Sequence, residues 1–139
     1  MRHLLGRRDA DEPSLDYAQA IPGVSEGRGI GIINTLHLIE IPPTIEALEE
    51  SSAATFPPGL SAGLRAWFRD LVEWMVTSDN GKEEAATINN HAVAFHLQLA
   101  VFAAFAGQGG GLPRAVQGAL RAGPDGARRQ LPLVLNNVM

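Results

Sequence analysis

The chain has 139 residues, the size of one domain, of which 45% are hydrophobic and 19% charged. Its 11 basic and 15 acidic residues give a net charge of -4 and form no basic stripe, so we expect no nucleic acid as partner. The absence of cysteine excludes disulfides and thiolate metal sites, and we expect neither a metal ion nor a cofactor. No apolar run is long enough to span a bilayer, so we expect no membrane partner.

Residues 1–28 are rich in glycine, proline and charge, and we expect them to form an N-terminal loop segment of the domain. Pro22-Gly23 is a turn signal within it. Met1 to Glu12 begins with basic residues but lacks an apolar core of signal-peptide length. Residues 29–139 are expected to form the helical part.

Two short helices are predicted first. The segment Ile30–Ile41 is apolar and is predicted to be helical until Pro42 and Pro43 interrupt it. A second helix is predicted over residues 43–51, because proline is accepted in a first helical turn. Pro57-Pro58-Gly59 then marks a loop.

The next helix has the clearest periodicity. Apolar residues recur at spacings of three and four, which predicts an amphipathic helix that ends near Thr77, with Ser61 as its cap. We expect the residues of this stripe to be core, Trp67 included. Trp74 falls off the stripe and either stacks on a sugar ring or packs between helices. Residues 78–84 are predicted to be a polar loop, with Glu83 and Glu84 on a solvated face. The stripe consists of Leu64, Trp67, Phe68, Leu71, Val72 and Met75.

A long helix is predicted over residues 89–106 and is apolar nearly all round, which is typical of a helix inside a larger helical assembly. We therefore expect the isolated chain to be marginally stable or to self-associate. After the glycine-rich loop 107–111, a further helix is predicted over residues 112–122, with Gly123 just past its end. No strand alternation is present, so the predicted fold class is all-α.

Asn89-Asn90-His91 is the strongest candidate site. Two carboxamides and an imidazole follow a polar loop and begin an apolar segment. An amide donates hydrogen bonds to a carboxylate without adding charge, and an imidazole moves protons near neutral pH. The structural alternative is a helix N-cap with a partly buried histidine, because asparagine is a favoured cap. The spacing alone leaves both interpretations open.

Four motifs together resemble the alginate lyase domain of the (α/α)-toroid polysaccharide lyases, over roughly residues 13–135. The resemblance implies antiparallel helical hairpins that form part of an (α/α) toroid, here incomplete. It also implies that an anionic polyuronate, alginate or a related acidic polysaccharide, is cleaved by β-elimination, in a secreted or periplasmic protein. In chain order the motifs are Tyr17-Ala18-Gln19-Ala20-Ile21-Pro22-Gly23, Gly27-Arg28-Gly29-Ile30-Gly31-Ile32-Ile33, Trp67-Phe68-Arg69-Asp70 and Asn89-Asn90-His91.

The resemblance also implies roles for individual residues. Asn90 would neutralise the uronate carboxylate and His91 would take part in proton abstraction; these are the expected catalytic residues. Tyr17, Gln19, Arg28 and Asn89 are the expected substrate-binding residues. From the residues alone, Tyr17 and Gln19 either line the substrate groove or are structural, and Arg28 either contacts a carboxylate or braces its loop.

The chain departs from the family pattern at several positions. Asn34 stands where the family usually has aspartate, and the run after His91 lacks the usual aromatic and acidic groups. The family continues past a Pro-Asp-Gly turn into a segment with an arginine and a catalytic tyrosine, whereas the only tyrosine here is Tyr17. We therefore expect a C-terminally truncated member. The alternative is a truncated or degenerate member that is inactive or only binds acidic glycans.

Overall fold

The computed structural model describes residues 13–51, 55–57, 59–107 and 111–122. In this part of the chain the only β-pairing is an isolated bridge between Ile21 and Ser25, so the predicted all-α class is confirmed. The helices in chain order are the 3-10 helix η1 (Gly29–Glu40), then α1 (Ile41–Ser51), α2 (Leu60–Thr77), α3 (Asp79–Ala85), α4 (Asn90–Gly107) and α5 (Arg114–Ala122).

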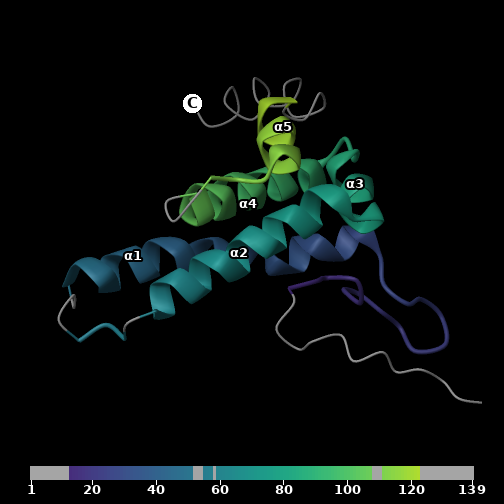
Figure 1. The fold of residues 1–139 in the computed structure, drawn as a ribbon. Helices are drawn as coiled ribbons and strands as arrows, with labels where there is room; N and C mark the ends of the chain where they lie inside the picture. The colour runs from purple at the N-terminus through teal and green to yellow at the C-terminus, as the bar shows by residue number, and fades with distance from the viewer. Residues whose placement is uncertain (1–12, 52–54, 58, 108–110, 123–139) are drawn as a thin grey trace, which may run out of the picture.

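Neighbouring long helices alternate in direction (Figure 1). Helices η1 and α1 follow one another along one side, α2 returns, and α4 returns again beside α2. The short helix α3 makes the turn between α2 and α4 and also packs against η1. Helix α5 lies across α2 and α4. Sequence-distant parts of the chain, η1 and the start of α4, are thereby brought together around α3.

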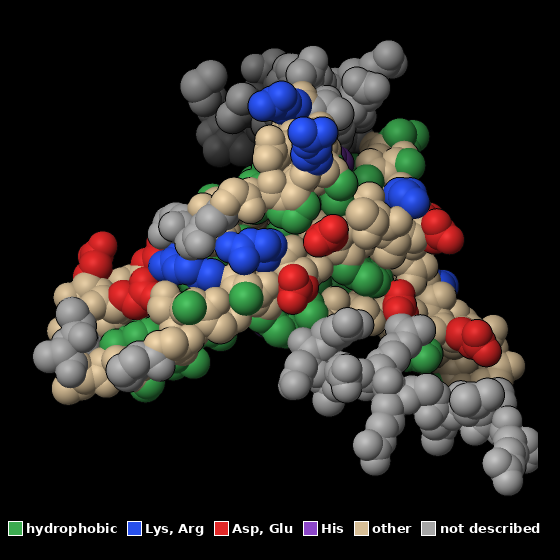
Figure 2. Space-filling model, in the orientation of Figure 1, with side chains coloured by type: hydrophobic (Ala, Val, Ile, Leu, Met, Phe, Trp, Pro, Cys, Tyr) green, Lys and Arg blue, Asp and Glu red, His purple; other side chains and the backbone are tan. Residues whose placement is uncertain are grey.

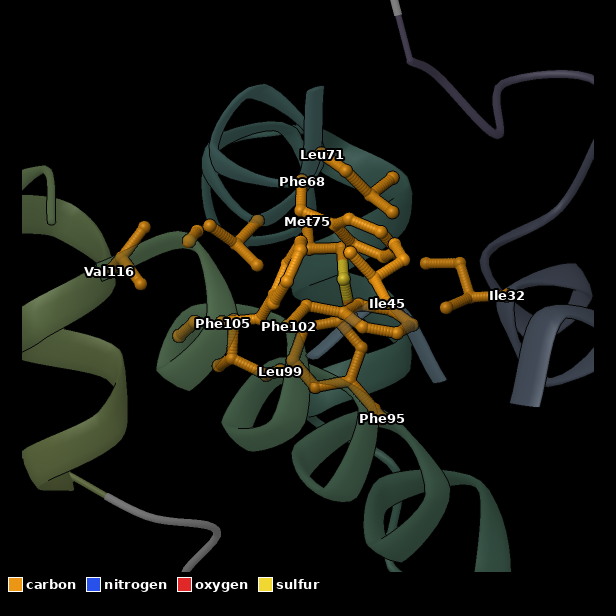
Figure 3. Packing of buried hydrophobic residues seen from close by; sticks show 13 residues of the cluster. Ile32, Ile45, Phe68, Leu71, Met75, Phe95, Leu99, Phe102, Phe105 and Val116 are labelled. Carbon is orange, nitrogen blue, oxygen red and sulfur yellow. The ribbon is translucent and has the colours of Figure 1, made fainter. Parts of the chain in front are cut away.

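The core lies mainly between α2 and α4 (Figure 3). The ring of Phe68 is 5.0 Å from that of Phe102 and 5.4 Å from that of Phe105, distances typical of favourable aromatic pairs. Each large side chain buried here contributes roughly 1.5–3 kcal/mol. The cluster also receives Ile32 from η1, Ile45 from α1 and Val116 from α5, so one core joins these helices.

Two predictions for α2 were wrong. Trp67 remains 37% exposed and meets Phe68 edge-on, because consecutive helix residues point about 100° apart and Phe68 takes the buried direction. Ser61 is not the cap, since the helix begins at Leu60 directly after Gly59, which has a φ of 82°. The Ser61 hydroxyl instead accepts a hydrogen bond from Arg65 Nε at 3.2 Å.

The first helical segment also differs from the prediction. Residues 29–40 form a 3-10 helix, and the α-helix begins at Ile41 and not at residue 43. Pro42 and Pro43 both lie in the first turn of α1, where a missing N–H costs little, so they start the α-helix without breaking the chain's helical course.

The predicted polar loop 78–84 is mostly helix α3. The hydroxyl of Ser78 accepts a hydrogen bond from the backbone N–H of Gly81 at 3.0 Å and caps this helix. A Cβ at Gly81 would overlap the carbonyl oxygen of Met75, so the absent side chain lets α3 pack closely against the end of α2.

Helix α4 has nine buried residues but keeps one apolar face open, where Val93 is 39% and Leu97 45% exposed. The helix is apolar nearly all round, as predicted, but the described helices bury only part of its surface. In the described part of the chain, no helix has both the length and the apolar character needed to cross a bilayer. The predicted turn at 124–126 and the C-terminal tail lie outside the described residues.

Candidate catalytic site

The predicted site residues of the Asn-Asn-His motif lie at the start of α4. Asn89 directly precedes the helix, and its Oδ1 accepts a hydrogen bond from the backbone N–H of His91 at 2.9 Å. Asn89 is therefore the N-cap, as the structural alternative required. Asn90, the first residue of α4, is exposed to solvent. The cap occupies an acceptor oxygen of Asn89 and not the amide N–H groups with which it would bind a carboxylate.

His91 contacts a buried acid. Its Nδ1 lies 2.8 Å from Oε1 of Glu84 on α3, a distance typical of a strong hydrogen bond. The side chain of His91 is 22% exposed, whereas that of Glu84 is fully buried. The imidazole thus has one edge on an interior carboxylate and remains accessible to solvent.

Glu84 was predicted to lie on a solvated face, and this prediction was wrong. Burial raises the pKa of its carboxyl above 4.5, and the hydrogen bond and charge of His91 offset part of that rise. Its second oxygen, Oε2, has no hydrogen-bond partner among the described residues. Residues seven apart on one continuous helix share a face but lie about 10 Å apart along its axis, whereas the break between α3 and α4 lets Glu84 and His91 meet. Sequence spacing therefore did not identify the pair.

A second group forms around the N-terminal end of η1. The guanidinium of Arg28 donates through Nη2 to Oε1 of Gln19 at 3.1 Å, and Nε2 of Gln19 lies 3.4 Å from Oδ1 of Asn34. Gln19 has a φ of 55°, in the left-handed region that non-glycine residues seldom adopt. The structure thus brings together the predicted residues Gln19 and Arg28. It adds Asn34, which sequence reasoning noted only as a departure from the family.

The loop that carries Tyr17 is held by backbone contacts. The backbone N–H of Arg28 donates to the carbonyl of Ala18 at 3.1 Å. Gly27 has a φ of 129°, and a Cβ there would overlap the carbonyl oxygen of Asp16, so glycine is required at this close approach. Tyr17 itself is 65% exposed. Its side chain is therefore accessible from solvent at the edge of the Gln19–Arg28 group.

Helix α3 contacts the segments that carry both groups. A Cβ at Gly29, next to Arg28, would come 2.7 Å from the carbonyl oxygen of Asn80 and 3.0 Å from a carboxylate oxygen of Glu83. The start of η1 therefore contacts the same short helix that carries Glu84 (Figure 1). Gly29, beside the Gln19–Arg28 group, and His91 therefore both contact α3.

A surface hollow elsewhere has the wrong charge for a polyanion. It measures about 590 Å³ and holds Trp74, whose predicted alternative was stacking on a sugar. Three carboxylates line the same hollow and would repel a uronate. None of the predicted site residues is among those that line it, which are Pro13, Ser14, Asp16, Asp70, Glu73, Trp74 and Thr77.

The described residues contain no group of three histidine, cysteine, aspartate or glutamate side chains placed to hold a metal ion. On the face shown in Figure 2, lysine and arginine are interspersed with aspartate and glutamate. The groups that remain for chemistry are an accessible imidazole on a buried carboxylate, an exposed carboxamide beside it, and an arginine held by an amide. Such a set can donate to an anion and accept a proton.

Comparison with known proteins identifies a family. The family model described as alginate lyase matches residues 4–127. No curated protein and no solved structure matches the chain. The matched range includes both the Gln19–Arg28 group and the start of α4 with Asn90 and His91.

Proposed function

The chain belongs to the alginate lyase family, and we propose that it cleaves an anionic polyuronate by β-elimination, with Asn90 and His91 as its catalytic residues. The observation that carries this proposal is the exposed Asn90 beside a solvent-accessible His91 whose other edge rests on buried Glu84. The family match supports the class of reaction, polysaccharide cleavage by a lyase.

The reaction needs two groups that this site contains. The C5 proton of a uronate is weakly acidic while the adjacent carboxylate keeps its full negative charge, so donors aimed at that carboxylate are the first requirement. Asn90 supplies amide N–H donors without a competing charge. A base must then accept the C5 proton, and a neutral His91 meets that need. The electrons of the C–H bond form the C4–C5 double bond, and the electrons of the C4–O bond leave with the glycosidic oxygen, which must then gain a proton.

Binding of the polymer must overcome the protein's net charge of -4. Arg28 supplies an exposed cation, and Oε1 of Gln19 accepts a hydrogen bond from its guanidinium at 3.1 Å. We propose that Arg28, with Tyr17 and Gln19, binds carboxylates or hydroxyls of neighbouring sugars. Asn89 is proposed to contribute its amide N–H groups while its oxygen caps α4.

A second candidate function is binding of acidic glycans without cleavage. It is favoured by one observation: the departing oxygen needs a proton, and the only tyrosine in the 139 residues is Tyr17, in the N-terminal loop and outside the Asn-Asn-His motif. A missing proton donor typically costs about 10²–10⁴-fold in rate. Such a protein would retain affinity for polyuronates and form little product.

The proposed architecture follows the family as well: the alternating helices would form part of an incomplete (α/α) toroid, in a protein that is secreted or periplasmic.

One experiment separates the two functions. The chain is incubated with polymannuronate, polyguluronate and alginate, and the ultraviolet absorbance of the unsaturated uronate is followed. Product supports the lyase, whereas binding measured by calorimetry without product supports the glycan-binding alternative.

A further inference from the structure

We propose that Glu84 is a positioning residue for His91: its buried carboxylate holds the imidazole proton on Nδ1 and so leaves Nε2 as the proton acceptor. The inference rests on the proposed function, in which His91 accepts the C5 proton. It adds a residue outside the Asn-Asn-His motif to the site.

The geometry defines the tautomer. An ionised carboxylate only accepts hydrogen bonds, so the 2.8 Å contact between Glu84 Oε1 and His91 Nδ1 requires a proton on Nδ1. A neutral imidazole carries a single ring proton, and Nε2 then has the lone pair. The same logic applies to histidines that bind metals, where the group behind the ring determines which nitrogen faces the ligand.

Glu84 is itself held firmly. Its backbone carbonyl accepts a hydrogen bond from the hydroxyl of Thr87 at 2.8 Å, and Ser78 caps the start of its helix. Helix α3 packs against η1, α2 and α4, so the backbone that carries the carboxylate is held by three other helices. A rigid acceptor orients the imidazole ring as well as its proton.

A purely structural role explains this burial poorly. A carboxylate without full hydrogen bonding in the interior is costly, and Oε2 of Glu84 has no partner among the described residues. Apolar side chains of similar volume commonly replace buried ion pairs without loss of stability. The titratable groups that act on Glu84 are His91 and its neighbour Glu83, and of these only His91 is hydrogen-bonded to it. The buried acid therefore serves the histidine.

The test reads the tautomer directly by ¹⁵N nuclear magnetic resonance of the histidine rings in the full chain, at a pH where the rings are neutral. Three proteins are compared: wild type, Glu84→Gln and Glu83→Gln. His96 is an internal reference, because its Nδ1 donates to the carbonyl of Ala92 at 2.8 Å independently of Glu84. His91→Ala assigns the His91 signals.

We expect the Nδ1–H form of His91 in wild type and in Glu83→Gln. In Glu84→Gln, where an amide both donates and accepts, we expect a marked rise of the Nε2–H form while His96 is unchanged. An Nε2–H form of His91 in wild type would overturn the proposal even if Glu84→Gln does not fold. An unchanged His91 pattern in a folded Glu84→Gln would overturn it too.

The steady-state kinetics of Glu84→Gln give a second test of the role of Glu84. Loss of the supporting group behind a functional histidine typically costs about 10–100-fold in activity, and we expect this fall in kcat with KM little changed. Unchanged kcat in Glu84→Gln would overturn the proposal. If wild type forms no unsaturated product, the proposed function fails, while the resonance experiment still decides whether Glu84 sets the tautomer.

Discussion

Thr35 on η1 donates a side-chain hydrogen bond to Oε1 of Gln98 on α4 at 2.8 Å, across 63 positions of sequence. Gln98 is completely buried, and its Nε2 reaches the carbonyl of Ala94 at 3.3 Å. The hydroxyl proton of Thr35 is shared with the carbonyl of Ile32, also at 2.8 Å. This pair links η1, which follows Arg28, to α4, which begins with Asn90, one of the two proposed catalytic residues.

Replacement of Thr35 by valine should destabilise the protein. Valine keeps the shape but leaves the buried Oε1 of Gln98 without its donor, which typically costs about 1–3 kcal/mol. The control is Thr44→Val on α1, where the exposed hydroxyl bonds only the local carbonyl of Glu40, and a change within about 0.5 kcal/mol is expected. Urea unfolding of both variants measures the free energy of unfolding. An equal decrease in the two variants would show that the Thr35–Gln98 hydrogen bond does not stabilise the protein more than the local bond of Thr44.

Gly81→Ala should be costly, because its Cβ would overlap the carbonyl oxygen of Met75 where α3 packs on α2. Overpacking of this kind typically costs about 1–3 kcal/mol. Gly63→Ala in α2 is the matched control, since a Cβ there meets nothing within 4 Å and alanine favours helix by about 1 kcal/mol. Thermal melting should therefore move in opposite directions for the two variants. A Gly81→Ala protein as stable as wild type would contradict the close packing of α3.

The pH dependence of stability should report the burial of Glu84. Its folded-state pKa is raised above 4.5, mainly by desolvation, so the folded protein holds this proton more tightly than the unfolded chain does. The contribution of Glu84 to the free energy of unfolding is therefore fully present below pH 4.5 and is lost as the pH rises through the folded-state pKa. The free energy of unfolding of wild type minus that of Glu84→Gln, measured in urea, should fall as pH rises from this range. A difference that increases with pH would contradict the raised pKa.

Arg28→Ala should weaken substrate binding. A charge-assisted hydrogen bond contributes about 1.5–3 kcal/mol, so we expect KM to rise by about tenfold or more with a smaller change in kcat. The effect should shrink at high salt, which screens an exposed charge. Arg114→Ala on α5, also exposed, is the control and should leave KM unchanged. Equal effects of the two substitutions would show that Arg28 acts only through the protein's net charge.

The long helices could be predicted from sequence because their apolar periodicity is local. Helix α4 begins and ends within one residue of the prediction, and the buried Phe68, Leu71, Val72 and Met75 belong to the predicted stripe. Helix α3 could not be predicted in the same way. It is seven residues long and contains Asp79, Asn80 and Gly81, which favour turns, so its helical form depends on the cap at Ser78 and on packing against η1 and α4.

In the candidate site, too, local features could be predicted from sequence, whereas contacts that depend on the fold could not. Asn89 as a cap and a half-buried His91 were within reach of sequence reasoning, because capping is local. Glu84 was missed because its burial depends on where α3 is held by the rest of the fold. The hydrogen bond from Arg28 to Gln19 needs the left-handed backbone of Gln19, which its residue type does not predict. Both contacts join residues fewer than ten apart in sequence, but each depends on a backbone path that only the folded chain shows.

The most direct test of the proposed lyase is formation of unsaturated uronate by wild type and by His91→Ala under one set of conditions. We predict that wild type produces it from at least one polyuronate and that His91→Ala lowers the rate by about 10²–10⁴-fold. His96→Ala, on the same helix, should retain the wild-type rate. An His91→Ala protein with wild-type turnover, or a wild type that binds polyuronates and releases no unsaturated product, would contradict the account.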